Sequence, residues 1–169
     1  SDSIPSINEE IIKYCPSLTK ITVPSSVEII KESEFSDCIS LKEIEIASSV
    51  TIIEDYAFSS CSSLLNVTIP DFVTSMGVYC FYNCSSLTQV NLPSSISSIQ
   101  DSTFRKCLSL KSITIPQSVK LIDSDSFAEC TSLSKISAPS NTLFFNNEIP
   151  KSIIIIIKKK TENATFIKK

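Results

Sequence analysis

The sequence predicts a solenoid, in which short coils of chain stack along one axis to form a single domain over residues 1–169. The first observation is a period of 23 residues. Leucine recurs at this interval, at Leu18, Leu41, Leu64, Leu87, Leu110 and Leu133. The second is that other apolar residues keep this interval, in the pattern L-x-x-(I/V)-x-(aliphatic)-P-x-x-(V/I)-x-x-(I/M)-x-x-x-x-F-x-x-C-x-S. A unit of this length cannot enclose its own core, so neighbouring coils must cover it.

The period divides the chain into three parts. Residues 1–17 fit a partial N-terminal repeat, 18–132 hold five complete repeats, and 133–169 form a divergent C-terminal repeat or cap. We number the complete repeats coils 1 to 5, and they begin at Leu18, Leu41, Leu64, Leu87 and Leu110. The period fails after Pro139, as expected where a terminal coil acts as a cap.

Each repeat opens with a segment that is expected to form a strand. In coil 3, Val67 and Ile69 lie two residues apart, as side chains on one face of a strand do, and Leu64 anchors the start. The proline that follows has no N–H for a ladder, so each strand should stop there; these residues are Pro24, Pro70, Pro93, Pro116 and Pro139. A period of roughly 20 to 29 residues with this segment is typical of a leucine-rich repeat.

A turn and a second wall should follow each strand. Serine pairs such as Ser25-Ser26 and Ser48-Ser49 predict a turn held by local bonds to backbone. Two apolar columns should line the second wall: Val27, Val50, Val73, Ile96 and Val119, then Ile30, Ile53, Met76, Ile99 and Ile122. A column of stacked rings should then supply the largest share of cohesion: Phe35, Phe58, Phe81, Phe104 and Phe127.

The cysteines and serines also follow the period, so they form columns and not a reactive site. Six of seven cysteines share one position, and Cys80 alone lies outside it: Cys15, Cys38, Cys61, Cys84, Cys107 and Cys130. Buried free thiols are favoured over disulfides or a metal site, because no Cys-x-x-Cys pair and no histidine occur. The serine column is expected to turn the chain into the next strand: Ser17, Ser40, Ser63, Ser86, Ser109 and Ser132.

Composition argues against several classes of function. The net charge of −3 provides no basic field for nucleic acid. The single glycine, Gly77, excludes glycine-rich phosphate loops. No histidine is available to activate a serine, and no pair of carboxylates has acid–base spacing, so we expect neither an enzyme nor a cofactor. Residues 1–14 lack the basic start and apolar run of a signal peptide.

The candidate protein-binding residues are apolar or aromatic side chains at positions that are mostly polar in the other repeats. Leu65 is the one strongly apolar residue among the outward positions of the strands, which are otherwise polar. Coil 3 carries Phe72 in place of a turn serine, and Val78, Tyr79 and Tyr82 where other coils are mostly polar. Tyr56 aligns with Tyr79 one coil earlier. Exposed aromatic residues are typical of interaction hot spots, although packing against the edge of the coil is an alternative reading.

A second candidate surface is the isoleucine run near the C-terminus, Ile153, Ile154, Ile155, Ile156 and Ile157. This run is far too short to span a membrane and predicts a final strand. Lysines flank it, as charged residues flank strands that would otherwise aggregate. We therefore expect either a protected edge or self-association of the chain at this end.

The repeat resembles that of the BspA-like family, also called the treponemal class of leucine-rich repeats, over about residues 4–139. The resemblance implies a right-handed solenoid with a parallel sheet on the concave face and short strands or helical turns on the convex face. It further implies a non-enzymatic protein-binding scaffold, with adhesion at a cell surface and extracellular-matrix proteins as partners. Alternatives are a homotypic structural module that assembles through its ends, or an intracellular adaptor, which the column of free cysteines favours.

Overall fold

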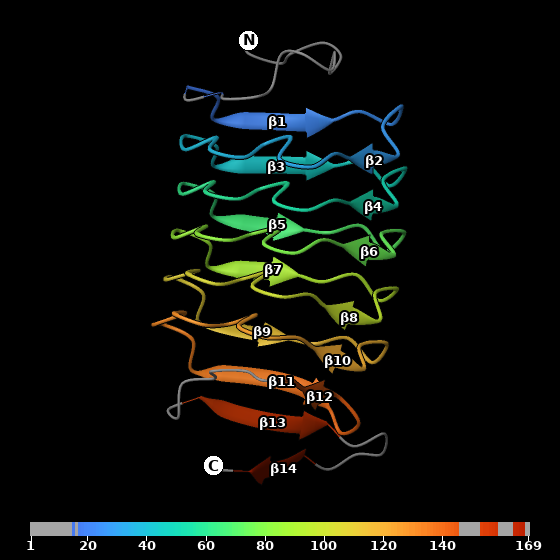
Figure 1. Cartoon of the computed structure of the whole chain (residues 1–169), viewed down its shortest axis with the longest axis vertical. Coiled ribbons are helices and arrows are strands. Elements are labelled where there is room, and N and C mark those ends of the chain that lie inside the picture. The colour runs from blue at the N-terminus through green and yellow to red at the C-terminus, as the bar shows by residue number, and fades with distance from the viewer. Residues whose placement is uncertain (1–14, 16, 146–152, 159–163, 168–169) are drawn as a thin grey trace.

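The structure is a computed structural model that describes residues 15, 17–145, 153–158 and 164–167. It confirms the predicted solenoid, in which parallel strands stack along one axis (Figure 1). The described residues form strands and turns and contain no helix. Most of the predicted N-terminal half-repeat lies outside them, apart from the half-buried Cys15.

The longer strands form the first wall. They are β1 (Lys20–Val23), β3 (Glu43–Ile46), β5 (Asn66–Thr68), β7 (Gln89–Asn91), β9 (Ser112–Thr114), β11 (Lys135–Pro139) and β13 (Ile154–Lys158). Paired positions in coils 1 to 5 differ by one repeat, as in Lys20↔Glu43 and Asn66↔Gln89. Buried and exposed side chains alternate along strands such as β1 and β5, so one face covers the core and the other meets solvent, whereas four consecutive residues of β11 are buried.

Short strands form the second wall, beside the first row in Figure 1. They are β2 (Ile29–Ile30), β4 (Ile52–Ile53), β6 (Ser75–Met76), β8 (Ser98–Ile99), β10 (Leu121–Ile122) and β12 (Leu143–Phe144). In β2, β4, β6, β8 and β10 the second residue is buried, as we predicted from the apolar column of Ile30, Ile53, Met76, Ile99 and Ile122.

The third side of each coil, between the second wall and the next long strand, carries a continuous backbone ladder. In coil 1, the N–H groups of Ser33, Phe35 and Asp37 donate to the carbonyls of Asp55, Ala57 and Ser59 in coil 2, at 2.8–3.0 Å. The same three bonds recur at every junction from coil 1 to coil 5. We refer to this side as the turn ladder.

Positive backbone φ angles flank the central phenylalanine of the turn ladder. Two residues per coil have φ between 52° and 61°: Ser33, Asp37, Tyr56, Ser60, Tyr79, Asn83, Ser102, Lys106, Asp125 and Glu129. None is glycine, although glycine adopts this conformation at least cost. In coils 1 to 4 the N–H of each of these residues donates to the next coil, so the ladder depends on this conformation.

The core is filled by the predicted columns. The five phenylalanine rings stack with centroids 5.1–5.7 Å apart and interplanar angles of 3–10°. All five side chains are almost completely buried. This spacing lies within the range favoured for aromatic pairs, so the rings join adjacent coils along the whole of the turn ladder.

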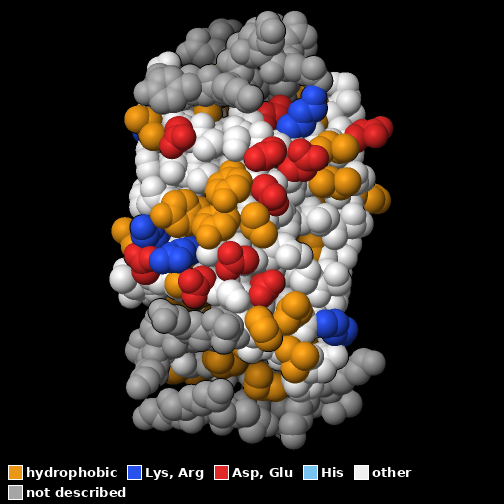
Figure 2. All heavy atoms as spheres, in the orientation of Figure 1, with side chains coloured by type: hydrophobic (Ala, Val, Ile, Leu, Met, Phe, Trp, Pro, Cys, Tyr) orange, Lys and Arg blue, Asp and Glu red, His pale blue; other side chains and the backbone are white. Residues whose placement is uncertain are grey.

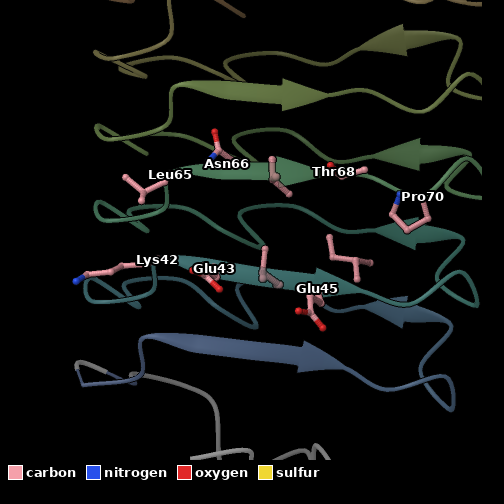
Figure 3. Close-up of a pocket in the computed structure, with 10 residues that line it drawn as sticks. Lys42, Glu43, Glu45, Leu65, Asn66, Thr68 and Pro70 are labelled. Atoms are coloured by element: carbon pink, nitrogen blue, oxygen red, sulfur yellow. The ribbon is translucent and has the colours of Figure 1, made fainter.

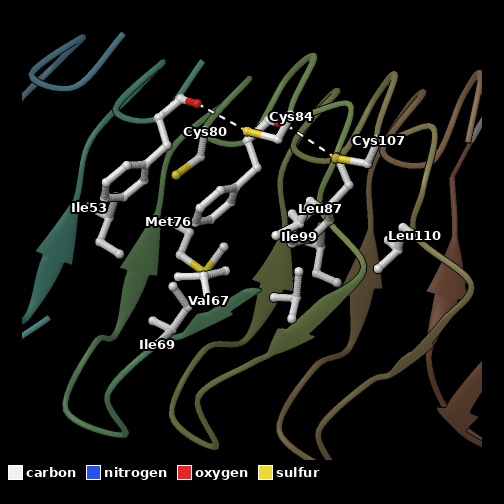
Figure 4. Close-up of a cluster of buried hydrophobic side chains, with 14 of the residues drawn as sticks. Ile53, Val67, Ile69, Met76, Cys80, Cys84, Leu87, Ile99, Cys107 and Leu110 are labelled. Carbon is white, nitrogen blue, oxygen red and sulfur yellow. Dashed lines mark hydrogen bonds between the residues drawn. The ribbon is translucent and has the colours of Figure 1, made fainter. Parts of the chain in front are cut away.

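The cysteine column is a set of hydrogen-bond donors (Figure 4). The thiols of Cys61, Cys84, Cys107 and Cys130 donate to the phenylalanine carbonyls of the preceding coil, with S···O distances of 3.0–3.3 Å. No disulfide joins any of the seven cysteines, and six of them are buried, in agreement with the favoured prediction. Burial raises the pKa of Cys38 to about 11 and that of Cys130 to about 12, and it raises the pKa of Cys84 well above its usual value. The thiols therefore remain protonated donors at neutral pH.

Two local predictions were wrong, and one was confirmed. β11 ends at Pro139, as predicted, and Pro139 itself pairs with Lys158. Ser49 Oγ and Ser95 Oγ do not bond locally, because they donate to Val27 O and Val73 O of the preceding coil. The isoleucine run is not the final strand, since β14 (Ala164–Ile167) follows and pairs with β13 antiparallel.

The serine column reverses the chain through backbone bonds. The N–H groups of Ser86, Ser109 and Ser132 donate to carbonyls of the preceding coil, at 3.1–3.2 Å. These bonds point toward the N-terminal end of the rod, whereas those of the turn ladder point toward its C-terminal end.

Both walls are interrupted, at different junctions. Within the part of the chain that the structure describes, the first wall forms one sheet from β1 to β7 and another from β9 to β14, without pairing between β7 and β9. The second wall is interrupted between β6 and β8. The turn ladder crosses both interruptions without a gap.

Candidate protein-binding surface

The turn ladder brings three of the predicted binding residues together. The rings of Tyr56 and Tyr79 stack with centroids 4.9 Å apart and an angle of 4° between their planes. Tyr82 meets Tyr79 edge to face at 5.6 Å. We refer to these residues as the tyrosine cluster. Tyr56 is exposed and the other two are half-buried, so the cluster presents aromatic surface to solvent.

Basic and acidic side chains border this cluster on its C-terminal side. The Lys106 ammonium lies 5.4 Å from the centre of the Tyr82 ring and donates to the Tyr82 hydroxyl at 3.1 Å. Arg105 binds Glu129 at 2.9 Å and Asp125 at 3.2 Å. The hydrogen bond to Tyr82 and the charge of Glu129 raise the pKa of Lys106. Figure 2 shows hydrophobic side chains gathered midway along the rod, with basic and acidic side chains beside them.

Tyr56 and Tyr79 occupy an unfavourable backbone conformation, with φ of 56° and 54°. Left-handed geometry costs a residue with a Cβ roughly 1–2 kcal/mol, and it is uncommon for bulky side chains. Small or acidic residues occupy this position in the other coils: Ser33, Ser102 and Asp125. Tyr56 and Tyr79 therefore depart from the residue types that the other coils place at this position.

The remaining predicted residues lie elsewhere on the rod. Val78 is adjacent to Tyr79, and its carbonyl accepts the Tyr56 N–H at 3.0 Å, so it supports the cluster through its backbone. Phe72 is 64% exposed in the turn between β5 and β6. Leu65 is exposed at the start of β5, in the first wall. The six predicted residues therefore do not form one continuous patch.

Leu65 borders a hollow of about 480 Å³ between β3 and β5. Figure 3 shows Glu43 and Glu45 on β3, with Lys42 just before it, and Asn66 and Thr68 on β5; Ile44, Ile46 and Val67 are also among the lining residues. The two strands pair at Glu43↔Asn66 alone among the described residues, whereas β1 and β3 pair at four positions. The hollow thus lies where the sheet opens, and polar and apolar side chains line it in equal number.

The isoleucine run contributes Ile154–Ile157 to β13, and Ile153 is buried just before it. One edge of β13 pairs with β11 and the other with β14. Ile154 is 49% exposed, and Ile155, Ile156 and Ile157 are half-buried. Both edges of this strand are therefore occupied by the chain itself.

Sequence reasoning missed Lys106, Arg105 and Glu129 as parts of the surface. Lys106 follows Tyr82 by 24 residues, one more than the repeat, so column alignment pairs it with Asn83 instead. A search for lysine or arginine residues that follow each of these tyrosines by one residue more than the repeat length would have found Lys106. The described ranges contain no group of three metal-ligating side chains and no helix long and apolar enough to cross a membrane.

Comparison with known proteins identifies the repeat. The BspA type leucine rich repeat region matches residues 5–134 and 51–166, with six copies. A crystal structure of a leucine-rich repeat protein from Bacteroides ovatus is 30% identical, with a TM-score of 0.62, and the match covers 83% of this chain and 45% of that one. This chain therefore spans less than half the length of that protein.

Two other solved structures agree. The leucine-rich repeat protein of T. pallidum has 26% identity and a TM-score of 0.67, with coverage of 76% of this chain and 70% of that one. A leucine-rich repeat protein from Eubacterium ventriosum has 25% identity and a TM-score of 0.66, covering 82% and 41%. No curated protein gives a significant match. Repeats of this class are generally non-enzymatic scaffolds that bind proteins, and the present chain belongs to the BspA type leucine-rich repeat family.

Proposed function

We propose that this chain binds a protein partner through the tyrosine cluster, and that it serves in adhesion at a cell surface. The observation that carries the proposal is the exposed Tyr56–Tyr79 stack, held in a backbone conformation that other coils give to small or acidic residues. Tyrosine offers a large, rigid contact area together with a hydroxyl, and it is enriched in the centres of protein interfaces. Extracellular-matrix proteins are the partner class that the family resemblance suggests.

The mixed border of the cluster also supports a protein partner over a small molecule. Lys106, Arg105 and Glu129 supply charges of both signs beside the rings. Small-molecule sites are usually enclosed and mostly apolar. The hollow beside Leu65 is open, and polar and apolar side chains line it alike, so it better suits an accessory contact in a protein interface.

The test is binding of the purified chain to immobilised extracellular-matrix proteins. The variant Tyr56→Ser/Tyr79→Ser/Tyr82→Ser should lose about tenfold or more in affinity, because hot-spot side chains each contribute about 2 kcal/mol or more. A control variant, Gln89→Ala/Asn91→Ala/Thr114→Ala, changes exposed polar residues on the first wall outside the hollow and should bind like the parent. Both variants should keep the parent's melting temperature to within a few degrees. Undiminished binding by the folded tyrosine variant would refute the proposal.

Self-association through Ile153–Ile157 is the weaker alternative, because neither edge of β13 is free. Its remaining support is the exposed side chain of Ile154.

A further inference from the structure

Tyr56 of coil 2 and Tyr79 of coil 3 lie face to face at the surface of the turn ladder. Their rings are parallel to within 4°, and their centroids are 4.9 Å apart. Tyr56 is exposed and Tyr79 is half-buried, so solvent reaches the pair. In two parallel rings the π orbitals of the carbon atoms point toward the neighbouring ring. A bond between ring carbons forms along this direction, so the pair has the geometry in which two phenols couple.

The backbone holds the two rings in this arrangement. Tyr56 and Tyr79 occupy the same position of successive coils and share a left-handed conformation, with φ of 56° and 54°. The Tyr56 N–H donates to Val78 O at 3.0 Å, and the Tyr79 N–H donates to Asp101 O at 3.1 Å. Both residues are thus fixed to the turn ladder. Groups that are held together in this way react faster than groups that must first meet by diffusion.

Tyr82, the third ring of the tyrosine cluster, is placed differently. It meets Tyr79 edge to face, at an angle of 71°, so its ring carbons do not stack on those of Tyr79. The Lys106 ammonium donates to the Tyr82 hydroxyl at 3.1 Å. A positive charge beside a phenol opposes the removal of an electron from it. Among the described tyrosines, geometry and charge therefore favour a reaction between Tyr56 and Tyr79.

We propose that Tyr56 and Tyr79 are an oxidative cross-linking site, at which a haem peroxidase with hydrogen peroxide joins the two rings into dityrosine. Each phenol gives up one electron and its hydroxyl proton. The two radicals then combine, and one carbon–carbon bond forms between ring carbons next to the hydroxyl-bearing carbons. A proton moves from each of these carbons to the phenolic oxygen, which restores both aromatic rings. The two electrons and two protons that were removed reduce one hydrogen peroxide to two waters.

The cross-link would join two coils whose first-wall strands are weakly paired. Among the described residues, β3 of coil 2 and β5 of coil 3 pair at Glu43↔Asn66 alone. A covalent bond between residues one repeat apart restricts the unfolded chain, so the oxidised chain should melt at a higher temperature than the parent. The reaction needs no partner protein, and it is therefore independent of the proposed function.

The position of Met76 provides a direct test. It is the single methionine and lies between Tyr56 and Tyr79 in the sequence, so cyanogen bromide divides the chain into residues 1–76 and 77–169. Its side chain is 3% exposed, which shields it from peroxide. The full chain is treated at low concentration with peroxidase and hydrogen peroxide, then cleaved and separated on a reducing gel. A Tyr56–Tyr79 cross-link keeps the two fragments together in one fluorescent band, whereas a Tyr79–Tyr82 cross-link does not.

Phenylalanine variants keep each ring and remove the reacting hydroxyl. Tyr56→Phe and Tyr79→Phe should each lower the yield of joined fragments about tenfold or more, because neither variant retains the pair. The controls are Tyr82→Phe, and Tyr14→Phe outside the described residues, and each should give a yield within about twofold of the parent. Circular dichroism before oxidation checks that all four variants are folded.

Joined fragments that persist in Tyr56→Phe or Tyr79→Phe would overturn the inference. It would also fail if Tyr82→Phe lowered the yield as much as Tyr56→Phe does, or if dityrosine formed only in dimers at every chain concentration. Matrix binding by the Tyr→Ser variant tests the proposed function separately, since that measurement uses chain that has not been oxidised.

Discussion

At the scale of single residues, the positions of the turn ladder with left-handed backbone geometry could not be predicted from the sequence. Such positions are normally recognised by glycine, and this chain has one glycine, which does not occupy any of them. Serine, aspartate, asparagine, lysine, glutamate and tyrosine stand there instead. The repeat compensates for the local strain with three intercoil bonds at each junction, and these become visible only when neighbouring coils are placed together.

Gly77 is explained by close approach, not by its backbone angle. A Cβ at this position would overlap Oδ1 and N of Asp55 and would lie 2.6 Å from the carbonyl carbon of Glu54. We therefore expect Gly77→Ala to lower the free energy of unfolding by about 1–3 kcal/mol, because backbone atoms would have to move. Gln100→Ala, at the same position of coil 4, should change it by less than about 0.5 kcal/mol. Chemical denaturation measures both, and equal stabilities for the two variants would contradict the close approach.

At the scale of elements, the columns were predictable because each one repeats five or six times. Leucine, isoleucine, phenylalanine and cysteine are buried in the positions that periodicity assigned to them, except for the partly buried Leu18 and Cys15 at the N-terminal end. Periodicity did not reveal what the cysteine contributes, since burial explains a small apolar residue equally well. The structure adds a reason for cysteine, because its thiol reaches the phenylalanine carbonyl of the preceding coil and donates a hydrogen bond to it.

The buried thiols should make stability fall at alkaline pH. Burial raises the pKa of Cys84 in the folded chain well above 9.0, so its thiol stays protonated while the unfolded chain ionises above about pH 9. The stabilising contribution is thus complete below pH 9 and is lost progressively above it, at about 1.4 kcal/mol per pH unit for each such thiol.

The variant Cys84→Ala tests this contribution. Unfolding followed by circular dichroism should show a loss of about 1–3 kcal/mol at neutral pH, from the missing hydrogen bond and the space left behind. Its stability should also fall less steeply with pH than that of the parent. The exposed Ser112→Ala should leave the slope unchanged, and an identical slope in Cys84→Ala would show that this thiol does not ionise on unfolding.

At the scale of the whole molecule, the solenoid and the parallel stacking of its strands followed from the sequence. The interruptions between β7 and β9 and between β6 and β8 did not, because the residues on either side still obey the repeat. Nor did the tyrosine cluster's cation, since Lys106 contacts Tyr82 across coils at a spacing outside the period. Periodicity therefore cannot predict the contacts that depend on the offset between neighbouring coils.

Amide hydrogen exchange should reveal the interruption of the first wall. The N–H groups of Ile69 and Ile115 donate to Asn91 O at 3.0 Å and Ser137 O at 2.7 Å. Leu92 holds the same position at the interruption, and among the described residues no backbone acceptor is found for its N–H. We expect the Leu92 amide to exchange at least about tenfold faster than the other two under native conditions, because local opening there breaks no bond. Equal protection of the three amides would show that the wall is continuous in solution.

The opposed directions of the intercoil bonds have an electrostatic consequence. In an α-helix all peptide dipoles add, so partial charges build up at its ends. Here the turn ladder aligns three N–H groups per junction toward the C-terminal end, while the N–H groups of Lys42, Thr51 and Glu54 donate to the preceding coil and point the other way. Their axial dipoles offset one another. A rod built in this way can be lengthened coil by coil without accumulating charge at its tips, which removes one electrostatic limit on the length of such an array.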